Sequence, residues 1–184
     1  MRIVAGTFGG RKIHVPKGRD IRPTTDKIRG AIFNALQSRG AVEGARVIDC
    51  FCGTGALGLE AISRGAERCV FIDNSRSSLD VAKENAAALG VKEEARFILK
   101  DAARLGPRPE GIPPATLVFI DPPYGEDLIA PALDVLHGSG WLAEGAILVL
   151  ESGKKDRMTI PSVYETLDER IYKDTKITTL RYNP

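Results

Sequence analysis

Two short segments of this 184-residue sequence contain residue types that could carry out chemistry together. The first, Gly53-Thr54-Gly55-Ala56-Leu57-Gly58, has the G-x-G-x-x-G spacing, which is typical of a turn that lets a nucleotide-like ligand approach the backbone closely. The second, Asp121-Pro122-Pro123-Tyr124, combines a carboxylate, carbonyl groups held by two prolines, and a flat aromatic ring. Together they predict a cofactor site next to an acceptor site for an N–H₂ group.

Acidic residues around the glycine loop narrow the choice of cofactor. Asp73 ends a predicted strand, where its carboxylate can accept hydrogen bonds from both hydroxyls of a ribose. Asp49 precedes Gly53 by four residues, where it could face the ammonium of a methionine moiety but would repel a pyrophosphate. This favours S-adenosylmethionine over a nicotinamide dinucleotide, and a purely structural turn with Asp73 as a helix cap is the other alternative. The predicted cofactor-binding residues are Asp49, Gly53, Thr54, Gly55, Asp73 and Asp101, the last of them facing the adenine amino group.

The Asp-Pro-Pro-Tyr segment has the groups that methylation of a nucleobase amino group needs. Such an amino group is a poor nucleophile, because its lone pair is delocalised into the ring. Acceptors that take both of its hydrogens favour the tetrahedral nitrogen of the transition state, and a carboxylate can take the released proton. The predicted catalytic residues are therefore Asp121, Pro122 and Tyr124, with Tyr124 stacking on the base. A plain turn after a strand is the alternative interpretation.

The elements that must position these residues follow an α/β pattern from residue 45 onward. Helical patterns at about 56–64, 75–89 and 126–137 lie between apolar runs that predict parallel strands at 46–51, 69–73, 96–99, 116–120 and 146–151. Two further β-rich runs, 163–172 and 176–182, predict an antiparallel hairpin, because little chain is left there for a crossover helix. The expected fold is therefore α/β, with a mostly parallel seven-stranded sheet and helices on both faces.

The first 44 residues differ from the rest in pattern and in charge. The runs 2–5 and 11–15 flank a glycine-rich turn and predict a small hairpin, and Thr24 or Thr25 could cap the helix that follows to about residue 37. Residues 1–40 hold nine Lys/Arg and two acids, whereas the other 144 residues hold 17 basic and 22 acidic ones. The net charge of +2 thus results from a basic N-terminal arm and an acidic remainder whose charges nearly cancel. The basic arm suggests a polyanionic partner, and a basic surface that is simply solvated is the alternative. We expect a basic extension over 1–44 and a catalytic domain over 45–184.

The two motifs resemble those of class I S-adenosylmethionine-dependent amino-methyltransferases, which have a Rossmann-like fold. The N-terminal segments 2–6, 10–13 and 22–29 are similar to those of the RsmD-type family, which methylates guanine N2 in the 16S RNA of the small ribosomal subunit. The resemblance implies a flipped guanine beside Asp121 and an RNA partner. It also implies substrate contacts by Arg2, Arg11, Lys12, Arg22, Thr24 and Tyr124.

Two residues depart from the pattern of that family. Tyr124 stands where the family often has Phe, and Asp73 stands where it often has Glu. Because Tyr is shared with adenine-specific relatives, an adenine-N6 DNA or RNA methyltransferase stays open as the alternative function. A nicotinamide-dependent oxidoreductase and a non-catalytic RNA-binding protein are the rivals from other classes.

The remaining features exclude several kinds of protein. Cys50, Cys52 and Cys69, with only His14 and His137 beside them in the sequence, form neither a zinc-ligand set nor a disulfide framework, so no metal is expected. No segment is long and apolar enough to span a bilayer, and no signal-peptide pattern follows Met1. We expect a cytoplasmic monomer.

Overall fold

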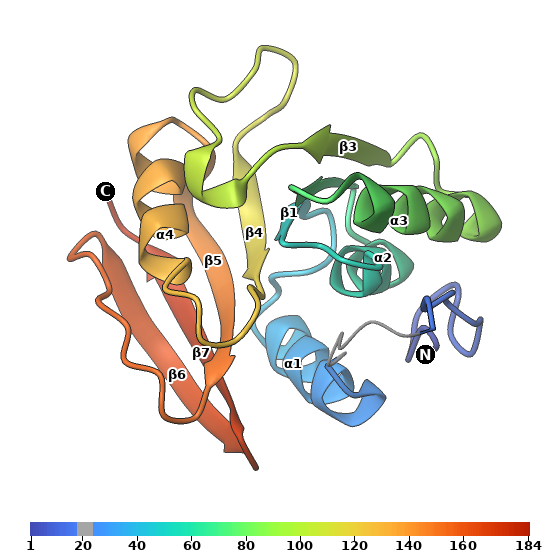
Figure 1. Cartoon of the computed structure of the whole chain (residues 1–184), viewed down its shortest axis with the longest axis horizontal. Helices are drawn as coiled ribbons and strands as arrows, with labels where there is room; N and C mark the ends of the chain where they lie inside the picture. The colour runs from blue at the N-terminus through green and yellow to red at the C-terminus, as the bar shows by residue number, and fades with distance from the viewer. Residues whose placement is uncertain (18–23) are drawn as a thin grey trace.

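The computed structural model of the chain describes residues 1–17 and 24–184 (Figure 1). No helix in the described part is both long enough and apolar enough to cross a membrane. The elements, in chain order, are α1 (Asp26–Ser38), β1 (Arg46–Cys50), α2 (Ala56–Ser63), β2 (Arg68–Asp73), α3 (Arg76–Leu89), β3 (Ala95–Leu99), the 3₁₀-helix η1 (Ala102–Arg104), β4 (Ala115–Ile120), α4 (Ile129–Gly138), β5 (Leu142–Gly153), β6 (Tyr164–Tyr172) and β7 (Thr175–Tyr182).

All seven strands form one sheet with the order β3-β2-β1-β4-β5-β7-β6. The five strands from β3 to β5 are parallel, and β7 and β6 are antiparallel additions at one edge. The predicted seven-stranded α/β sheet with an antiparallel C-terminal hairpin is therefore confirmed. The strand order reverses between β1 and β4, so the carboxyl ends of these two strands flank the crevice where ligands bind in open α/β sheets.

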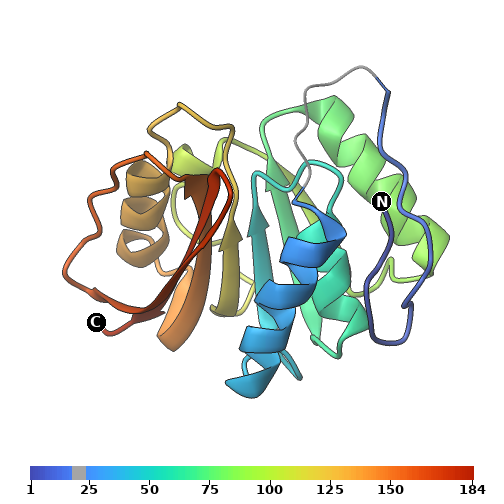
Figure 2. The same cartoon turned by 90° about the horizontal axis from the view of Figure 1, so that it is seen from below.

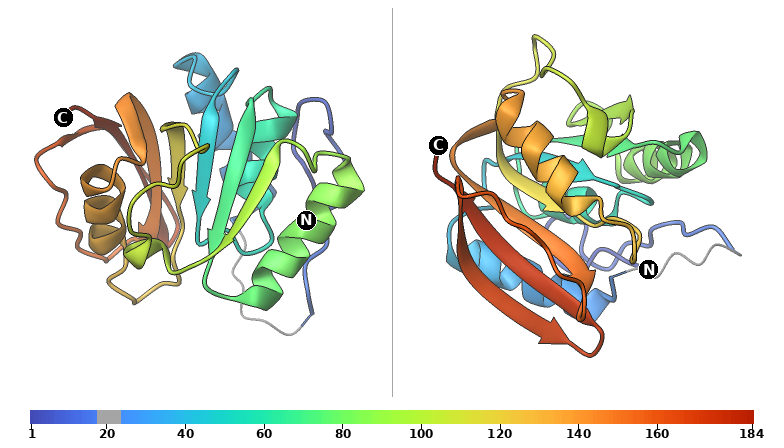
Figure 3. Two further views of the ribbon diagram at one scale, coloured as in Figure 1. Left: turned by 90° about the horizontal axis from the view of Figure 1, so that it is seen from above. Right: turned by 60° about the vertical axis from the view of Figure 1, so that its left-hand side comes forward.

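Helices cover both faces of the sheet, as predicted, because most of the strands are apolar on both sides (Figure 3). One face carries α1, α2 and α3, which bury Phe33, Leu59 and Leu79 in a single apolar cluster with side chains of the strands. The opposite face is covered by α4, which buries Leu133 and Leu136. The crossover from β3 to β4 has only η1 as regular helix and otherwise runs as the proline-containing loop.

Three details differ from the expectation. The N-terminal hairpin is present but shorter than expected: Arg2 and Lys12 form one antiparallel bridge, and the N–H of Ile3 donates to the carbonyl of Arg11 at 2.9 Å beside it. α4 begins three residues later than expected, because Gly125 has φ 80° and a turn precedes the helix. β5 is longer than expected at both ends, since its first residue pairs with β4 and its last with β7.

The N-terminal segment packs into the same core as the sheet. Ile3 and Ile13 are fully or nearly fully buried in the cluster that also holds Phe33 of α1 and Phe119 of β4. The rings of Phe33 and Phe119 lie 5.4 Å apart. The division at residue 45 therefore stays a hypothesis about function, since residues on both sides of it share one core.

Candidate functional site

A cavity of about 590 Å³ opens at the carboxyl ends of β1, β2 and β4. This volume lies in the range of about 300–1,000 Å³ that is usual for small-molecule sites. The structure brings to its wall eight of the residues predicted to bind or react: Thr24, Asp49, Gly53, Thr54, Asp73, Asp121, Pro122 and Tyr124. The glycine loop and the Asp-Pro-Pro-Tyr segment thus face a common space, although 62 residues lie between Gly58 and Asp121.

The glycines of the glycine loop have two different roles: one leaves the backbone open to a ligand, and another lets α2 pack against β2. A side chain at Gly53 would meet no other atom within 4 Å, so the backbone there is open to a ligand. At Gly58, by contrast, there is no room for a side chain, because a Cβ there would lie 2.4 Å from the ring of Phe71. Gly58 therefore lets α2 pack closely on β2, and Gly55, at the N-cap of α2 with φ 79°, lies behind the cavity wall.

Two acids at the cavity hold the glycine loop through its backbone. Asp73 accepts hydrogen bonds from the N–H groups of Gly53, at 3.0 Å, and of Ser75, at 2.8 Å. The buried Asp49 accepts one from the N–H of Gly58, at 2.9 Å. Burial raises the pKa of Asp49 to about 8, with the negative charge of Asp73 adding to the shift and the hydrogen bond from Gly58 opposing it.

The Asp-Pro-Pro-Tyr segment starts where β4 ends. Burial raises the pKa of Asp121 well above its usual range, and the charges of Glu151 and Asp49 raise it further. Tyr124 keeps 38% of its surface exposed, and its hydroxyl donates to Oε1 of Glu151 at 2.9 Å and lies 2.9 Å from Oγ1 of Thr175. The segment thus offers a carboxyl group that is easily protonated and an aromatic ring that is tethered at its hydroxyl end.

Glu151 is a residue of the site to which the sequence analysis gave no role. It is 5% exposed at the carboxyl end of β5, and Oε2 accepts a hydrogen bond from the hydroxyl of Thr24 at 2.5 Å. With Tyr124 on Oε1, Glu151 connects the N-terminal extension to the Asp-Pro-Pro-Tyr loop. Its position at a strand end beside the site is visible in the sequence, but no motif marks it.

Phe51 is another residue of the site that the sequence analysis missed. It has φ 58°, the left-handed region that non-glycine residues seldom adopt, and it lines the cavity. Backbone strain of this kind costs about 1–3 kcal/mol and often accompanies ligand sites. Nothing in the residue type of Phe51 signals this conformation.

Several predicted residues are not in the cavity wall. Asp101 caps η1, where its carboxylate accepts from the N–H of Ala103 at 2.9 Å. The exposed Arg2 and Lys12 form the N-terminal bridge. Arg11 donates to the carbonyl of Ala88 and lies over the ring of Phe8. The prediction for Arg22 falls on residues 18–23, outside the described part of the chain.

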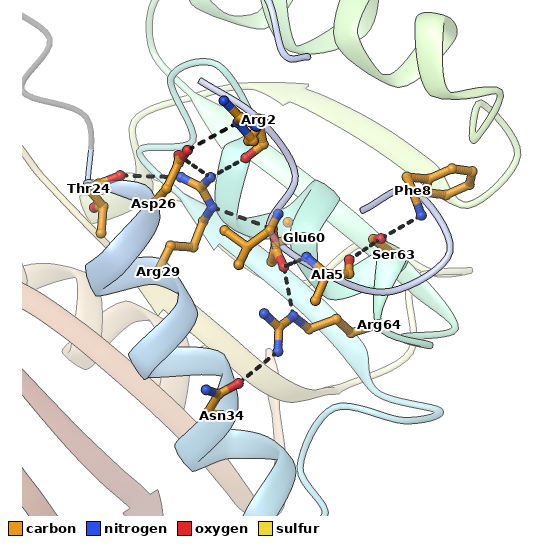
Figure 4. A network of polar contacts seen from close by, with 12 residues as sticks. Arg2, Ala5, Phe8, Thr24, Asp26, Arg29, Asn34, Glu60, Ser63 and Arg64 are labelled. Carbon is orange, nitrogen blue, oxygen red and sulfur yellow. Dashed lines mark hydrogen bonds and ion pairs between the residues drawn. The ribbon is translucent and has the colours of Figure 1, made fainter. Parts of the chain in front are cut away.

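One basic residue of the N-terminal region is buried and makes its polar contacts inside the protein (Figure 4). Arg29 of α1 is fully buried; it donates to the carbonyl of Thr24 at 3.2 Å and to Asp26 at 2.8 Å. Its Nε lies 3.5 Å from Oε2 of the fully buried Glu60. The basic arm therefore presents one cation fewer to a partner than its composition suggests.

Glu60 fastens the N-terminal segment to the helix that follows the glycine loop (Figure 4). Its carboxylate accepts hydrogen bonds from the N–H groups of Val4, at 2.8 Å, and Ala5, at 3.1 Å. It also pairs with Nε of Arg64 at 2.7 Å. Because Glu60 belongs to α2, which follows the glycine loop, the N-terminal extension and the glycine loop are held in one arrangement.

Comparison with known proteins identifies the relatives of this chain. A family described as conserved hypothetical protein 95 matches residues 1–181. The chain is 34% identical over 172 residues to the ribosomal RNA small subunit methyltransferase D of Escherichia coli, covering 93% of this chain and 84% of the relative. The protein of the same name from Haemophilus influenzae is 30% identical, covering 92% of this chain and 88% of that protein.

Solved structures agree with these sequence matches. A proposed methyltransferase from Escherichia coli superposes with a TM-score of 0.85 at 32% identity, over 100% of this chain and 98% of that one. A Thermus thermophilus protein described as hypothetical gives a TM-score of 0.75 at 28% identity, over 97% and 98% of the two chains. Both likenesses extend over the N-terminal extension as well as the sheet. The resemblance seen in the motifs is thus confirmed, and this chain belongs to the conserved hypothetical protein 95 family, that of the RsmD-type proteins.

Proposed function

We propose that this protein is an S-adenosylmethionine-dependent methyltransferase that modifies the exocyclic N2 of a guanine in 16S ribosomal RNA. The observation that carries the proposal is the common cavity, which is lined by the glycine loop, by Asp73 and by the Asp-Pro-Pro-Tyr segment. The names of the relatives support a ribosomal RNA substrate. We infer that the enzyme acts as a monomer in the cytoplasm, with the small subunit or an assembly intermediate as its partner.

The residues at the cavity fit this cofactor. Gly53 leaves its backbone open to a ligand, and Asp73 ends β2 beside it, where a carboxylate can accept from ribose hydroxyls. The buried Asp49 offers a carboxylate to an ammonium group. When bound, S-adenosylmethionine would supply a methyl group made electrophilic by the sulfonium that carries it. The chain therefore needs to hold the cofactor and to activate the acceptor nitrogen.

Asp121 and its neighbours would activate that nitrogen. Pro122 and Pro123 have no N–H groups, so the backbone of the segment offers carbonyl acceptors, and the Asp121 carboxylate offers a further one. Accepting both hydrogens of the amino group orients its lone pair toward the methyl group, and Asp121 takes the proton that leaves. Tyr124 would stack on the base and so hold the ring in place.

Transfer of label from S-adenosylmethionine to three separate substrates tests the proposed substrate class. The substrates are small ribosomal subunits from an Escherichia coli strain deleted for the similar methyltransferase, naked 16S RNA, and duplex DNA. We expect label in the RNA of the first or the second and none in DNA. Label in DNA alone would overturn the proposal in favour of the adenine-N6 alternative, and binding without transfer would favour a non-catalytic RNA-binding protein.

Cofactor binding should strengthen as the pH rises from 6 to 8. Asp49 has its pKa raised to about 8, so it is mostly protonated at pH 6 and must ionise to pair with an ammonium. Each pH unit in this window should therefore tighten binding of S-adenosylhomocysteine by up to about tenfold, and the effect should level off above pH 8. Calorimetry at four pH values measures this. Asp49→Asn should bind weakly with little pH dependence, and a wild-type affinity that is flat over the window would contradict the role of Asp49.

Two substitutions at Tyr124 should separate its ring from its hydroxyl. Tyr124→Ala removes the stacking surface, so we expect the KM for the RNA substrate to rise and kcat to fall, together by about 10–100-fold in kcat/KM. Tyr124→Phe keeps the ring and removes the hydrogen bond to Glu151, so it should lose no more than about fivefold. Steady-state kinetics on small subunits measures both. Equal losses in the two variants would show that the hydroxyl, not the ring, is what matters.

A further inference from the structure

A second group of basic side chains lies at the carboxyl edge of the sheet, far in sequence from the basic extension. It consists of Lys154, Lys155 and Arg157, which follow β5, and Lys173, which lies in the turn between β6 and β7. All four side chains are exposed, and no ion pair joins any of them to an acid in the part of the chain that the structure describes. We call them the carboxyl-edge cluster.

The carboxyl-edge cluster adjoins the Asp-Pro-Pro-Tyr site through specific contacts. The N–H of Lys154 donates to the carbonyl of Asp174 at 2.7 Å, which joins the β5 end to the β6–β7 turn. Gly153 pairs in register with Thr175. Oγ1 of Thr175 in turn lies 2.9 Å from the hydroxyl of Tyr124. Lys173 therefore lies two residues from Thr175, which contacts the hydroxyl of the proposed base-stacking residue, and Lys154 pairs with the residue between them.

The cluster and the N-terminal segment lie on opposite sides of the site. In Figure 2 the β6–β7 hairpin and the loop after β5 occupy the left half of the molecule, and the N-terminal segment occupies the right half. The loop after β1, which lines the cavity, and α1 lie between them. A nucleic-acid strand that delivers a base into the cavity would thus pass basic side chains both before and after that base.

Lys173 occupies a backbone position that favours glycine. Tyr172 and Thr175 are paired, so Lys173 and Asp174 form a two-residue turn, and Lys173 has φ 55°. A hairpin turn with positive φ at its first residue is usually made with glycine or asparagine there. Lysine keeps a cation at the tip of the hairpin at a conformational cost of the order of 1 kcal/mol.

The basic residues of the cluster outnumber the acids in the same segments. Asp156, between Lys155 and Arg157, uses Oδ2 to accept the N–H of Gly153 at 2.7 Å. Five basic and two acidic residues lie in the segments 153–157 and 173–176 together, although the chain beyond residue 40 has an excess of acids. The local excess of positive charge next to the site suits a polyanion and not a cationic or apolar partner.

We propose that the carboxyl-edge cluster binds the phosphodiester backbone of the substrate RNA on the side of the target base opposite to the N-terminal extension. This inference rests on the proposed function for the identity of the RNA. Phosphates on both sides of the extruded base would then be held, which fixes the strand at two points while the base enters the cavity. The contacts give affinity and position but no sequence readout.

Binding of the wild type and of the triple variant Lys154→Ala/Lys155→Ala/Lys173→Ala tests the inference. The probes are naked 16S RNA and unmodified small subunits, each titrated at several salt concentrations. We expect the variant to bind both about tenfold or more weakly at 0.15 M salt, with a slope of log affinity against log salt that is shallower by about 2. Its affinity for S-adenosylhomocysteine should be unchanged, which shows that the fold and the cavity are intact.

A second triple variant, Arg68→Ala/Lys92→Ala/Arg96→Ala, is the matched control, and it uses basic residues outside the N-terminal extension. It removes the same charge from exposed positions toward the amino ends of β2 and β3, and it should bind RNA within about twofold of the wild type. Equal losses in the two variants, or no loss in the first, would overturn the inference. Weaker binding to subunits with unchanged binding to naked RNA would also overturn it, in favour of a contact with ribosomal protein.

A measurement on the wild type does not depend on the stability of any variant. Hydrogen exchange at the amides of residues 154–157 and 173–174 should slow when 16S RNA is added, and unchanged exchange there would contradict the proposal. Because these experiments measure binding and not methyl transfer, their outcome is separate from that of the proposed reaction. If the wild type binds RNA in this way but methylates another base, the role of the cluster in RNA binding would be supported and the proposed function would be wrong.

Discussion

Replacing Asp121 with Asn should lower kcat for methyl transfer by about 10³-fold and leave cofactor binding within about threefold of the wild type. Asn keeps one acceptor oxygen but cannot take a proton, and its own N–H₂ group points a donor at the amino group that must be held. General-base catalysis contributes about 10²–10⁴-fold, and one hydrogen bond to a transition state contributes about 10²–10³-fold. Single-turnover methylation of small subunits and calorimetry with S-adenosylhomocysteine measure the two effects separately.

Asp127→Asn is the control for this substitution. Asp127 is an exposed acid six residues further along the same loop and lies outside the cavity wall, so its loss should change kcat by less than about twofold. The raised pKa of Asp121 adds a second test, because the protonated carboxyl group cannot take the proton that leaves the amino group. The wild-type rate should therefore climb with pH above the range of an ordinary carboxyl group, near 4. Full activity of Asp121→Asn would remove the proposed mechanism.

Replacing Glu60 with Gln should lower the free energy of unfolding by about 3–5 kcal/mol. Glu60 is fully buried between two buried arginines, Arg29 and Arg64, and it also accepts the N–H groups of Val4 and Ala5. Gln leaves the guanidinium groups without their carboxylate and turns a donor toward other donors. Denaturant unfolding monitored by circular dichroism measures the loss.

Glu67→Gln is the matched comparison for Glu60→Gln. Glu67 also pairs with an arginine, Arg68, but both side chains are about half exposed, so this ion pair should contribute less than about 1 kcal/mol. A loss at Glu60 no larger than the loss at Glu67 would show that the buried network does not fasten the extension. We further expect Glu60→Gln to weaken RNA binding, since the N-terminal extension would no longer be held on α2.

The sheet could be predicted from sequence because its strands are buried on both faces. Runs such as 116–120 contain no polar residue except Thr116, and this continuity distinguishes a central parallel strand from an amphipathic helix. The N-terminal hairpin is shorter than its apolar pattern suggests. Ile3 and Ile13 are buried in the core, but their backbones are joined by one antiparallel bridge and the hydrogen bonds beside it, and they do not form continuous strands.

Residues of the candidate site could be predicted where a sequence motif lies at the end of a strand. They could not be predicted where their role depends on contacts with residues far away in the sequence. Gly53, Asp73 and Asp121 follow directly from their positions at the carboxyl ends of strands. Glu151 could not be assigned, because its partner Thr24 is 127 residues away along the chain. Arg29 was counted with the basic arm, since composition does not distinguish a buried cation from an exposed one.

Identification of the modified nucleoside is the most direct test of the proposed methylation of guanine N2 in 16S RNA. Small subunits that lack the modification are incubated with the enzyme and S-adenosylmethionine, and the 16S RNA is digested and analysed by mass spectrometry. We expect one N2-methylguanosine per RNA with the wild-type enzyme and none with Asp121→Asn. N6-methyladenosine as the product, or N2-methylguanosine formed equally well by Asp121→Asn, would contradict it.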